Sequence, residues 1–274
     1  MKKLMTNFYP FVLILLIGIS FSDNAYAAGS DVNKQQEKSI KILTVGNSFA
    51  DNACQWLEPI AASVPGYNIS VTKANIGGCS LEKHVSVIES CKNNSESKPY
   101  YKKYCLQDLL VKDEYDYITI QQVSTLSFKP ESFQPWADSL ISYIKRYSPD
   151  SEIIIHQTWA YAPESKRYAT WNMSREQMHE GLVESYNQLA DQLELEIIPS
   201  GEAFYKATTS QDDIYLWRKD AHHANDEGCY LAGCVWFGKL LNVSPKKVNY
   251  VPEEMDNKTA KFLRKMAHKT LKEL

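Results

Sequence analysis

The chain has 274 residues, a formal net charge of −3 and a mean hydropathy of −0.39. This mildly acidic balance argues against binding to nucleic acid and to anionic membrane surfaces. The length is sufficient for one large α/β domain with a sizeable core.

Residues 1–27 have the pattern of a secretory signal peptide. Two lysines precede the apolar run Phe11–Ile19, and Ala25-Tyr26-Ala27 has the small residues of a cleavage site. Such a segment is too short to span a membrane stably. We therefore expect an exported protein, periplasmic or extracellular, without stable membrane insertion after cleavage. Residues 28–39 would form a linker and residues 40–274 the folded domain.

The six cysteines are compatible with disulfide formation in an exported chain. Cys91 and Cys105 flank a polar stretch, so they are the pair we expect, although sequence alone cannot decide among the possible pairings. No C-x-x-C motif for a metal is present. We expect buried or structural roles for the other four, which are Cys54, Cys79, Cys229 and Cys234.

The first predicted element is a strand at Ile42–Val45, an apolar run typical of a strand buried on both faces of a parallel sheet. The chain then bends at Gly46-Asn47-Ser48, and a helical pattern follows over Asn52–Ala62. Ser48 thus lies at the carboxyl end of a strand, where open α/β sheets bind ligands. A helix N-terminus beside it favours negative charge that develops nearby.

Strands and helices alternate through the rest of the chain. Further strands are predicted at Asn68–Ala74, Asp116–Gln121, Glu152–Ile155 and Leu195–Ile198. Helices are predicted from about Leu81 and at Phe133–Tyr147, Ser174–Gln192, Gly201–Lys206, Asn225–Leu241 and Glu253–Leu271. Ser174 and Gln177 form a capping box. The pattern predicts a single-domain α/β fold, a three-layer α/β/α sandwich with a central, mostly parallel, five-stranded sheet.

Polar residues follow the strands and precede the helix at Asn225–Leu241. We expect them at one edge of the sheet: Ser48, Gly77 and Gly78, Gln121 and Gln122, His156 and Trp159, and Asp220 with His222 and His223. A serine hydroxyl is a weak nucleophile without an adjacent base. In Asp220-x-x-His223 the carboxylate can fold back onto Nδ1 of the imidazole and leave Nε2 facing Ser48.

The sequence therefore predicts a catalytic Ser48, His223 and Asp220. An oxyanion hole would use the backbone amides of Ser48 and of Gly77 or Gly78, with the side-chain amide of Gln122. No metal site is predicted. The remaining polar and aromatic residues near the strand ends are expected to contact substrate: Asn47, Gln121, His156, Trp159 and His222.

These motifs resemble those of the SGNH/GDSL hydrolases. Gly46-Asn47-Ser48 is similar to the first block of that superfamily, with Asn47 in place of the usual aspartate, and Asp220-x-x-His223 matches the fifth block. Gly77 or Gly78 stands at the glycine of the second block. The third block, G-x-N-D in the family, is here Gln121-Gln122-Val123-Ser124, so its oxyanion asparagine is missing. The chain resembles a divergent exported branch of the superfamily, of the DUF4886 type.

The resemblance implies hydrolysis of an acyl ester through an acyl-serine intermediate, without metal or cofactor. The substrate would be a small-molecule or polysaccharide ester, with acetyl groups on carbohydrate the leading expectation. Aromatic residues of the loops would stack on sugar rings: Trp159, Tyr161, Tyr168, Trp171, Tyr215 and Trp217. The sugar, the acyl group and the oligomeric state stay open.

Two alternatives remain. One is a lipase, thioesterase or arylesterase of the same mechanism, and the other is a glycan-binding protein without catalysis. An α/β-hydrolase with a nucleophile elbow is rejected, because there the serine comes mid-chain and the acid well before the histidine.

Overall fold

The computed structural model describes residues 37–94, 96–210 and 214–273. The predicted signal peptide and residues 28–36 of the predicted linker lie outside the described residues. The first strand, β1, begins at Lys38, so the last two residues of the predicted linker belong to the sheet. Within the described ranges, no helix combines the length and the apolar character that a membrane crossing requires.

The centre of the fold is a sheet of five parallel strands in the order β2-β1-β3-β4-β5. The last five residues of β1 are all buried, as expected for a strand covered on both faces. The strands are β1 (Lys38–Gly46), β2 (Tyr67–Asn75), β3 (Tyr117–Ile120), β4 (Glu152–His156) and β5 (Glu196–Ile198).

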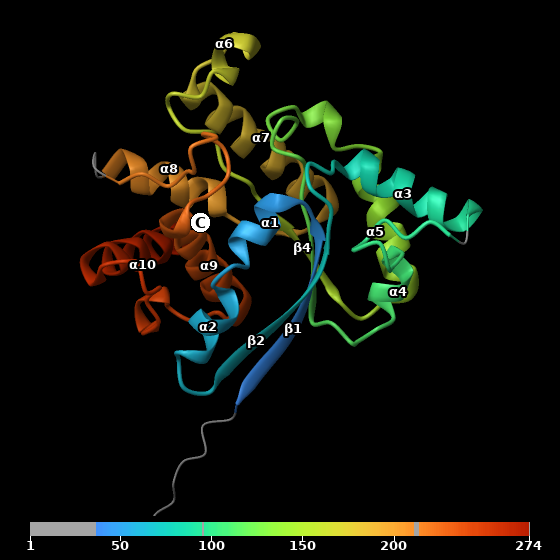
Figure 1. Cartoon of the computed structure of the whole chain (residues 1–274), viewed down its shortest axis with the longest axis horizontal. Helices are drawn as coiled ribbons and strands as arrows, with labels where there is room; N and C mark the ends of the chain where they lie inside the picture. Colours follow the sequence, from blue (N-terminus) through green and yellow to red (C-terminus); the bar gives the residue numbers. More distant parts are fainter. Residues whose placement is uncertain (1–36, 95, 211–213, 274) are drawn as a thin grey trace, which may run out of the picture. The chain divides into compact units, whose positions relative to one another are not determined.

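Helices cover both faces of the sheet, because side chains alternate along each strand (Figure 1). Ile42 and Ile154 point into one core, and Leu43 and Ile155 point into the other. The first core is covered by α1 (Ser48–Ala53), α2 (Leu57–Ala62), α8 (Ser200–Ser210), α9 (Asp226–Leu241) and α10 (Asn257–Lys272).

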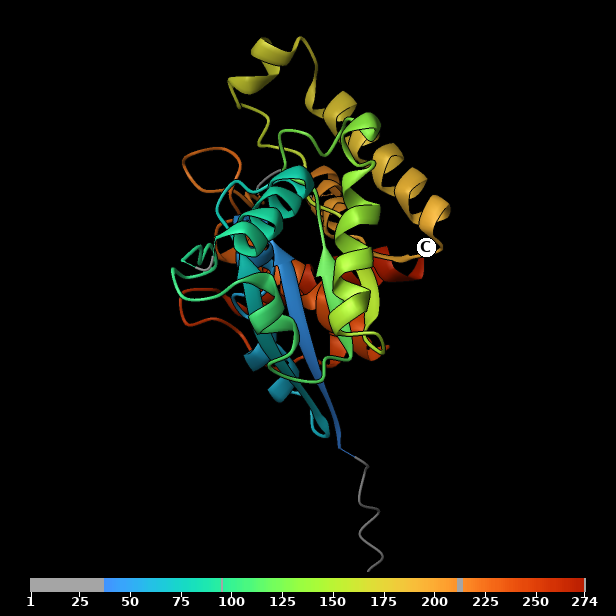
Figure 2. The ribbon, with the colours of Figure 1, turned by 90° about the vertical axis from the view of Figure 1, so that its right-hand side faces the viewer.

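The second core is covered by α3 (Leu81–Asn93), α4 (Leu106–Leu110), α5 (Trp136–Tyr147) and most of α7 (Arg175–Leu193). Figure 2 shows the green helices in front of the blue strands and the red helices behind them. The predicted three-layer α/β/α architecture is therefore confirmed, as is the capping box of Ser174 and Gln177, and α9 is buried along most of its length.

Some element boundaries differ from the sequence prediction. The helix expected at Asn52–Ala62 is two short helices, and the first begins at Ser48 because the Asn47 side chain caps it. Pro59 explains the interruption, since proline inside one continuous helix would remove a backbone hydrogen bond, whereas in the first turn of α2 it is tolerated. Helices α4 and α6 (Arg167–Trp171) were not predicted.

The strand order places a topological switch point between β1 and β3. From β1 the chain goes first to its neighbour β2 and later to β3 on the opposite side. The connections that leave β1 and β3 therefore run in opposite directions, and open α/β sheets bind ligands at such a point. Ser48 follows β1 after the single residue Asn47, and Gln121 follows β3 directly.

Candidate active site

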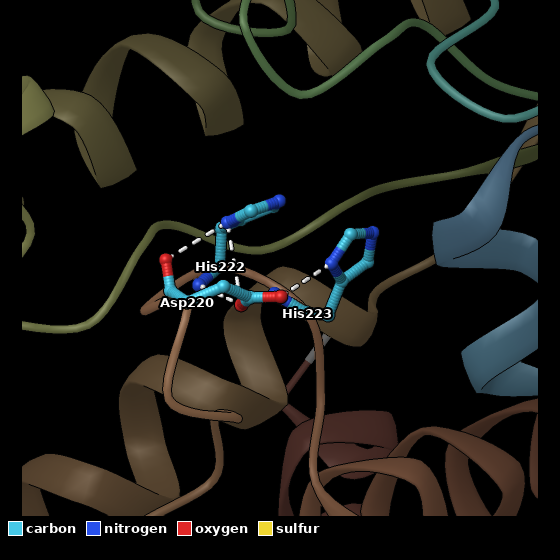
Figure 3. A group of neighbouring side chains, drawn as sticks. All are labelled: Asp220, His222 and His223. Atoms are coloured by element: carbon cyan, nitrogen blue, oxygen red, sulfur yellow. Dashed lines mark hydrogen bonds and ion pairs between the residues drawn. The ribbon is translucent and has the colours of Figure 1, made fainter.

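Three side chains lie in file at this edge of the sheet. The Oγ of Ser48 is 2.8 Å from Nε2 of His223. The Nδ1 of His223 is 2.8 Å from Oδ2 of Asp220, and Figure 3 shows the carboxylate against the ring. Because Nδ1 donates to the carboxylate, Nε2 is the acceptor for the serine hydroxyl. The arrangement has the order nucleophile, base and orienting acid.

The Asp220 carboxylate is held in its ionised form. Its Oδ1 accepts hydrogen bonds from the backbone N–H groups of His222 and His223, at 3.0 and 2.9 Å. Burial alone would raise the pKa of Asp220, but these two bonds and the one from the His223 ring outweigh burial and lower the pKa to about 2. Ala221 has a φ of 62°, which turns the chain so that the carboxylate can face the two residues that follow.

The loop that carries His223 is fixed from several directions. The backbone N–H of Ala224 donates to Oδ1 of Asn52 in α1, at 3.2 Å. The backbone N–H of Arg218 donates to the carbonyl of His223, at 2.7 Å. Gly228 in the first turn of α9 lets the loop approach closely, because a Cβ there would lie 2.3 Å from the Leu216 carbonyl oxygen. The His223 loop is thus held against α1, the helix that begins at Ser48.

Asn47 joins the serine turn to the loop after β2. Its Oδ1 accepts from the backbone N–H of Phe49, which caps α1, and its Nδ2 donates to the carbonyl of Cys79 at 2.9 Å. The Gly46 carbonyl accepts from the backbone N–H of Ile76, at 3.0 Å. These bonds hold the Gly77-Gly78 loop beside Ser48.

Backbone amides for an oxyanion are present at this junction. Among the described residues, the N–H groups of Ser48, Gly77 and Gly78 have no hydrogen-bond partner. Both glycines are exposed, and no atom lies within 4 Å of where a Cβ would stand on either of them. Gly78 also has a φ of 63°, in the left-handed region where glycine is favoured. An oxygen that develops negative charge can approach these donors without steric obstruction.

Gln122 does not supply the third donor that the sequence predicted. It is fully buried, and its Nε2 donates to the carbonyl of Ser132 at 2.8 Å. Its Oε1 accepts from the backbone N–H groups of Leu81 and Val123, at 3.1 and 2.8 Å. The amide is therefore occupied in joining the end of β3 to the start of α3, and the prediction of an oxyanion role is wrong.

The predicted substrate contacts of Asn47, Gln121 and His156 are also wrong, because all three are buried. They form one hydrogen-bonded chain. Nε2 of Gln121 donates to Oδ1 of Asn47 at 2.7 Å, so Oε1 of Gln121 accepts from Nδ1 of His156, also at 2.7 Å. Nε2 of His156 then accepts from Oγ of Ser200, at 3.1 Å. The chain connects β3, β4 and α8 to the residue before the nucleophile.

Trp159 supports the histidine loop from inside the core instead of contacting substrate. Its ring stacks on Phe49 and Phe204, with centroids 4.5 and 4.4 Å apart, and its Nε1 donates to the His222 carbonyl at 3.0 Å. Most of the other proposed sugar-stacking residues are also buried: Tyr161, Tyr168 and Trp217. Trp171 is half-buried and Tyr215 is exposed.

His222 is the one predicted substrate contact that is partly exposed beside the triad. Its ring centroid is 4.2 Å from that of His223. Asp220, His222 and His223 offer ligand atoms within 4.8 Å of one another, as a metal site would require. However, the Asp220 carboxylate is already hydrogen-bonded to His223 and to two backbone N–H groups, and Nδ1 of His222 faces the Asp220 carbonyl at 2.9 Å. These contacts suit a proton relay better than a metal centre.

One family model covers most of the chain. The family model described as "Domain of unknown function (DUF4886)" matches residues 41–270. The chain belongs to the DUF4886 family. No relative among curated proteins matches it.

Solved structures share the fold of this DUF4886 domain. A DUF4886 family protein from Bacteroides uniformis is 29% identical, with a TM-score of 0.75 over 85% of this chain and 95% of its own. A protein from Slackia heliotrinireducens, described as "a putative SGNH hydrolase", is 18% identical, with a TM-score of 0.54 over 74% of this chain and 100% of its own. The acetyl xylan esterase AlAXEase is 12% identical, with a TM-score of 0.52 over 73% of this chain and 100% of its own. The fold is that of the SGNH hydrolases, as the sequence motifs predicted.

Two supporting residues of the DUF4886 domain were missed in the sequence. His84 is fully buried in α3, where its Nε2 donates to the Gly46 carbonyl at 3.0 Å and its Nδ1 accepts from the Tyr100 hydroxyl at 2.9 Å. Burial lowers the pKa of His84 to about 4, so the ring is neutral. Its place on the apolar stripe with Leu81 and Ile88 was an available signal. No sequence pattern indicated the role of Asn52, because the backbone N–H that it accepts belongs to Ala224, 172 positions away.

Proposed function

We propose that the chain is an exported serine esterase that hydrolyses acyl esters, first of all acetyl esters on carbohydrate. The proposal rests on the hydrogen-bonded row of Ser48, His223 and Asp220. Ser48 Oγ is 2.8 Å from His223 Nε2, and His223 Nδ1 is 2.8 Å from Asp220 Oδ2. Few structural roles require a half-buried hydroxyl, an imidazole and an ionised carboxylate in this order at a ligand-binding edge.

The chemistry follows from the positions of these groups. Ser48 Oγ attacks the ester carbonyl carbon while Nε2 of His223 takes the hydroxyl proton. The carbonyl oxygen becomes an oxyanion beside the free N–H groups of Ser48 and the Gly77-Gly78 loop. The C–O bond to the alcohol then breaks, and His223 returns its proton to the leaving alkoxide.

Deacylation repeats the sequence with water. His223 takes a proton from water, whose oxygen attacks the acyl-serine, and then gives this proton back to Ser48 as the carboxylic acid leaves. The ionised Asp220 keeps Nδ1 protonated throughout and stabilises the imidazolium that forms in each half-reaction.

The surroundings of the site favour a polar substrate. Ser48 and His223 line a cavity of about 560 Å³ whose other walls include Asp51, Lys73 and Arg218. A long-chain acyl group would desolvate these charged side chains at considerable cost, so the cavity supports a carbohydrate ester over a lipid or a long-chain thioester. The similarity in fold to an acetyl xylan esterase is consistent with this choice.

Export is supported by one covalent feature. Cys91 and Cys105 are disulfide-bonded, as the sequence predicted. Disulfides persist mainly in oxidising compartments, so the bond fits a periplasmic or extracellular location. The four other cysteines are buried and free, in agreement with the expected structural roles.

Acetate release tests the proposal. The purified chain, Ser48→Ala and the control Ser86→Ala are incubated with p-nitrophenyl acetate and with acetylated xylan. Ser86 is an exposed residue of α3 whose hydroxyl, among the described residues, bonds only to the Glu82 carbonyl of its own helix, at 3.0 Å. We expect Ser48→Ala to lower kcat by about 10⁴-fold or more and Ser86→Ala to match the unaltered chain. Equal rates for the chain and Ser48→Ala would overturn the proposal, and polysaccharide binding without acetate release would favour the glycan-binding alternative.

A further inference from the structure

The cavity beside Ser48 carries charges that the ester chemistry does not use. Apart from Ser48 and His223, its charged walls are Asp51, Glu58, Lys73 and Arg218. None of these four is needed for acyl transfer to Ser48. Their positions therefore bear on what the rest of the substrate contains.

Three of the four charges are accounted for by contacts within the chain. Nζ of Lys73 is 3.5 Å from Oδ1 of Asp51, so these two neutralise each other. Oε1 of Glu58 accepts from the backbone N–H of Val71, at 2.9 Å. Val71 pairs with Ile42 in the sheet, four residues before the end of β1, so Glu58 lies roughly 13 Å back from the catalytic edge.

Arg218 lies at the other end of the cavity, next to the base. Its backbone N–H donates to the His223 carbonyl, and its Nε donates to the Ala224 carbonyl at 2.9 Å. These bonds leave the terminal nitrogens of the guanidinium for a partner. The thiol of Cys229 is a hydrogen-bonding neighbour of the guanidinium, but the ion pairs of the described residues do not include Arg218.

We infer that Arg218 binds a carboxylate on the substrate, so that the preferred ester is carried by a uronic acid unit or its neighbour in a polysaccharide. A guanidinium held through Nε presents its terminal N–H groups in a planar fork that matches a carboxylate bidentately. Arg218 lines the same cavity as Ser48 and His223, and no carboxylate of the described residues pairs with it there. This inference rests on the proposed esterase function and specifies its substrate class.

A matched pair of substrates isolates this contact. O-acetylated polygalacturonate and its fully methyl-esterified form carry the same acetyl groups, but only the first has free carboxylates. The measured quantity is the ratio of kcat/KM between the two polymers, which cancels any general loss of activity. We expect the unaltered chain to prefer the carboxylate form by about 10- to 100-fold, the range of a hydrogen bond to a charged group. The preference should fall as salt is added.

Variants of Arg218 then test whether this residue causes the preference for the carboxylate polymer. Arg218→Gln should bring the ratio close to one, and Arg218→Lys, which keeps the charge without the fork, should give an intermediate value. Lys219→Gln is the control, because Lys219 is an exposed cation next in sequence that does not line the cavity. A purely structural role of Arg218 would lower kcat/KM for both polymers equally and leave the ratio unchanged, which would overturn the inference.

The failure of this inference differs from failure of the proposed function. If Ser48-dependent acetate release occurs with no preference between the two polymers, the esterase stands and the carboxylate contact is wrong. If neither polymer nor p-nitrophenyl acetate is hydrolysed, both proposals are overturned.

Discussion

The Oγ of Ser48 and Nε2 of His223 are 2.8 Å apart, although 175 positions separate the two residues in the chain. Ser48 opens α1 at the end of β1, and His223 precedes α9, and both helices pack on the same face of the sheet. Phe49 adds a contact between the two segments, with its ring centroid 5.8 Å from that of His223. The hydrogen bond is therefore a consequence of core packing.

The first prediction concerns the orienting acid. In Asp220→Asn, the side-chain oxygen can still accept hydrogen bonds from the backbone N–H groups of His222 and His223, so the loop should keep its shape. The amide nitrogen, however, would face Nδ1 of His223 as a donor and favour the tautomer with Nε2 protonated, which cannot accept the Ser48 proton. We expect kcat to fall by about 10³- to 10⁴-fold with little change in KM, measured as initial rates of p-nitrophenyl acetate hydrolysis.

The control for this variant is Asp226→Asn. Asp226 is an exposed carboxylate at the start of α9 that accepts from Nε2 of Gln55, at 2.7 Å. Its replacement should leave kcat within about threefold, since a surface contact of this kind contributes little. A similar loss in both variants would mean that general loop stability, and not the tautomer of His223, determines the rate.

The second prediction separates stability from catalysis at Gln122. Gln122→Ala leaves the buried N–H of Leu81 without its acceptor, so the free energy of unfolding should fall by about 1–3 kcal/mol in urea titrations. The rate should fall by less than about tenfold, because the Gln122 amide faces Ser132 and not the serine turn. Loss of an oxyanion donor would instead lower kcat by about 10²- to 10³-fold, so that result would restore the catalytic role.

Local sequence patterns were sufficient for the strands and for the selection of Ser48, Asp220 and His223, whose side chains are in hydrogen-bond contact in the structure. Asp220-x-x-His223 is a short-range motif, because its carboxylate and imidazole meet within one turn of chain. Ser48 is located by a strand that ends at a glycine. Neither inference requires knowledge of how distant segments pack, which is why both could be made from the sequence.

Side-chain direction could not be predicted in the same way. Gln121 and Trp159 do follow strands, and His156 is the last residue of β4, yet all three side chains point into the protein. Position at a strand end specifies the edge of the sheet but not which way a side chain faces. Their partners, such as Ser200 for His156, come from segments whose approach depends on the whole fold.

The third prediction concerns the disulfide. It closes a loop with a sequence separation of 14, so its removal in Cys91→Ser/Cys105→Ser should lower the free energy of unfolding by about 3 kcal/mol. Cys91 lies in α3 and Cys105 caps α4, on the face of the sheet opposite α1 and α9. We therefore expect kcat to stay within about twofold. Stability that is identical with and without reducing agent in the unaltered chain would contradict this assignment.

The fourth prediction concerns acid stability and His156. Burial between Gln121 and Ser200 lowers the pKa of His156 to about 3, whereas a histidine in the unfolded chain titrates near pH 6.5. Between these values unfolding takes up a proton, so the stability that the neutral ring contributes is complete above about pH 6.5. It is lost progressively as the pH falls towards 3.

His156→Gln removes this titration and keeps groups that can hydrogen-bond to both neighbours. Between pH 6 and pH 4.5, the variant should take up about one proton fewer on unfolding. The slope of its unfolding free energy against pH should therefore be smaller by ~1.4 kcal/mol per pH unit. Urea titrations at a series of pH values measure the slope, and the buried His84 continues to contribute its own share in both proteins. Should the variant fail to fold, NMR of the unaltered chain gives the same information. A His156 ring resonance that titrates between pH 5 and pH 8 would contradict the prediction, because burial would then not keep the ring neutral in this range.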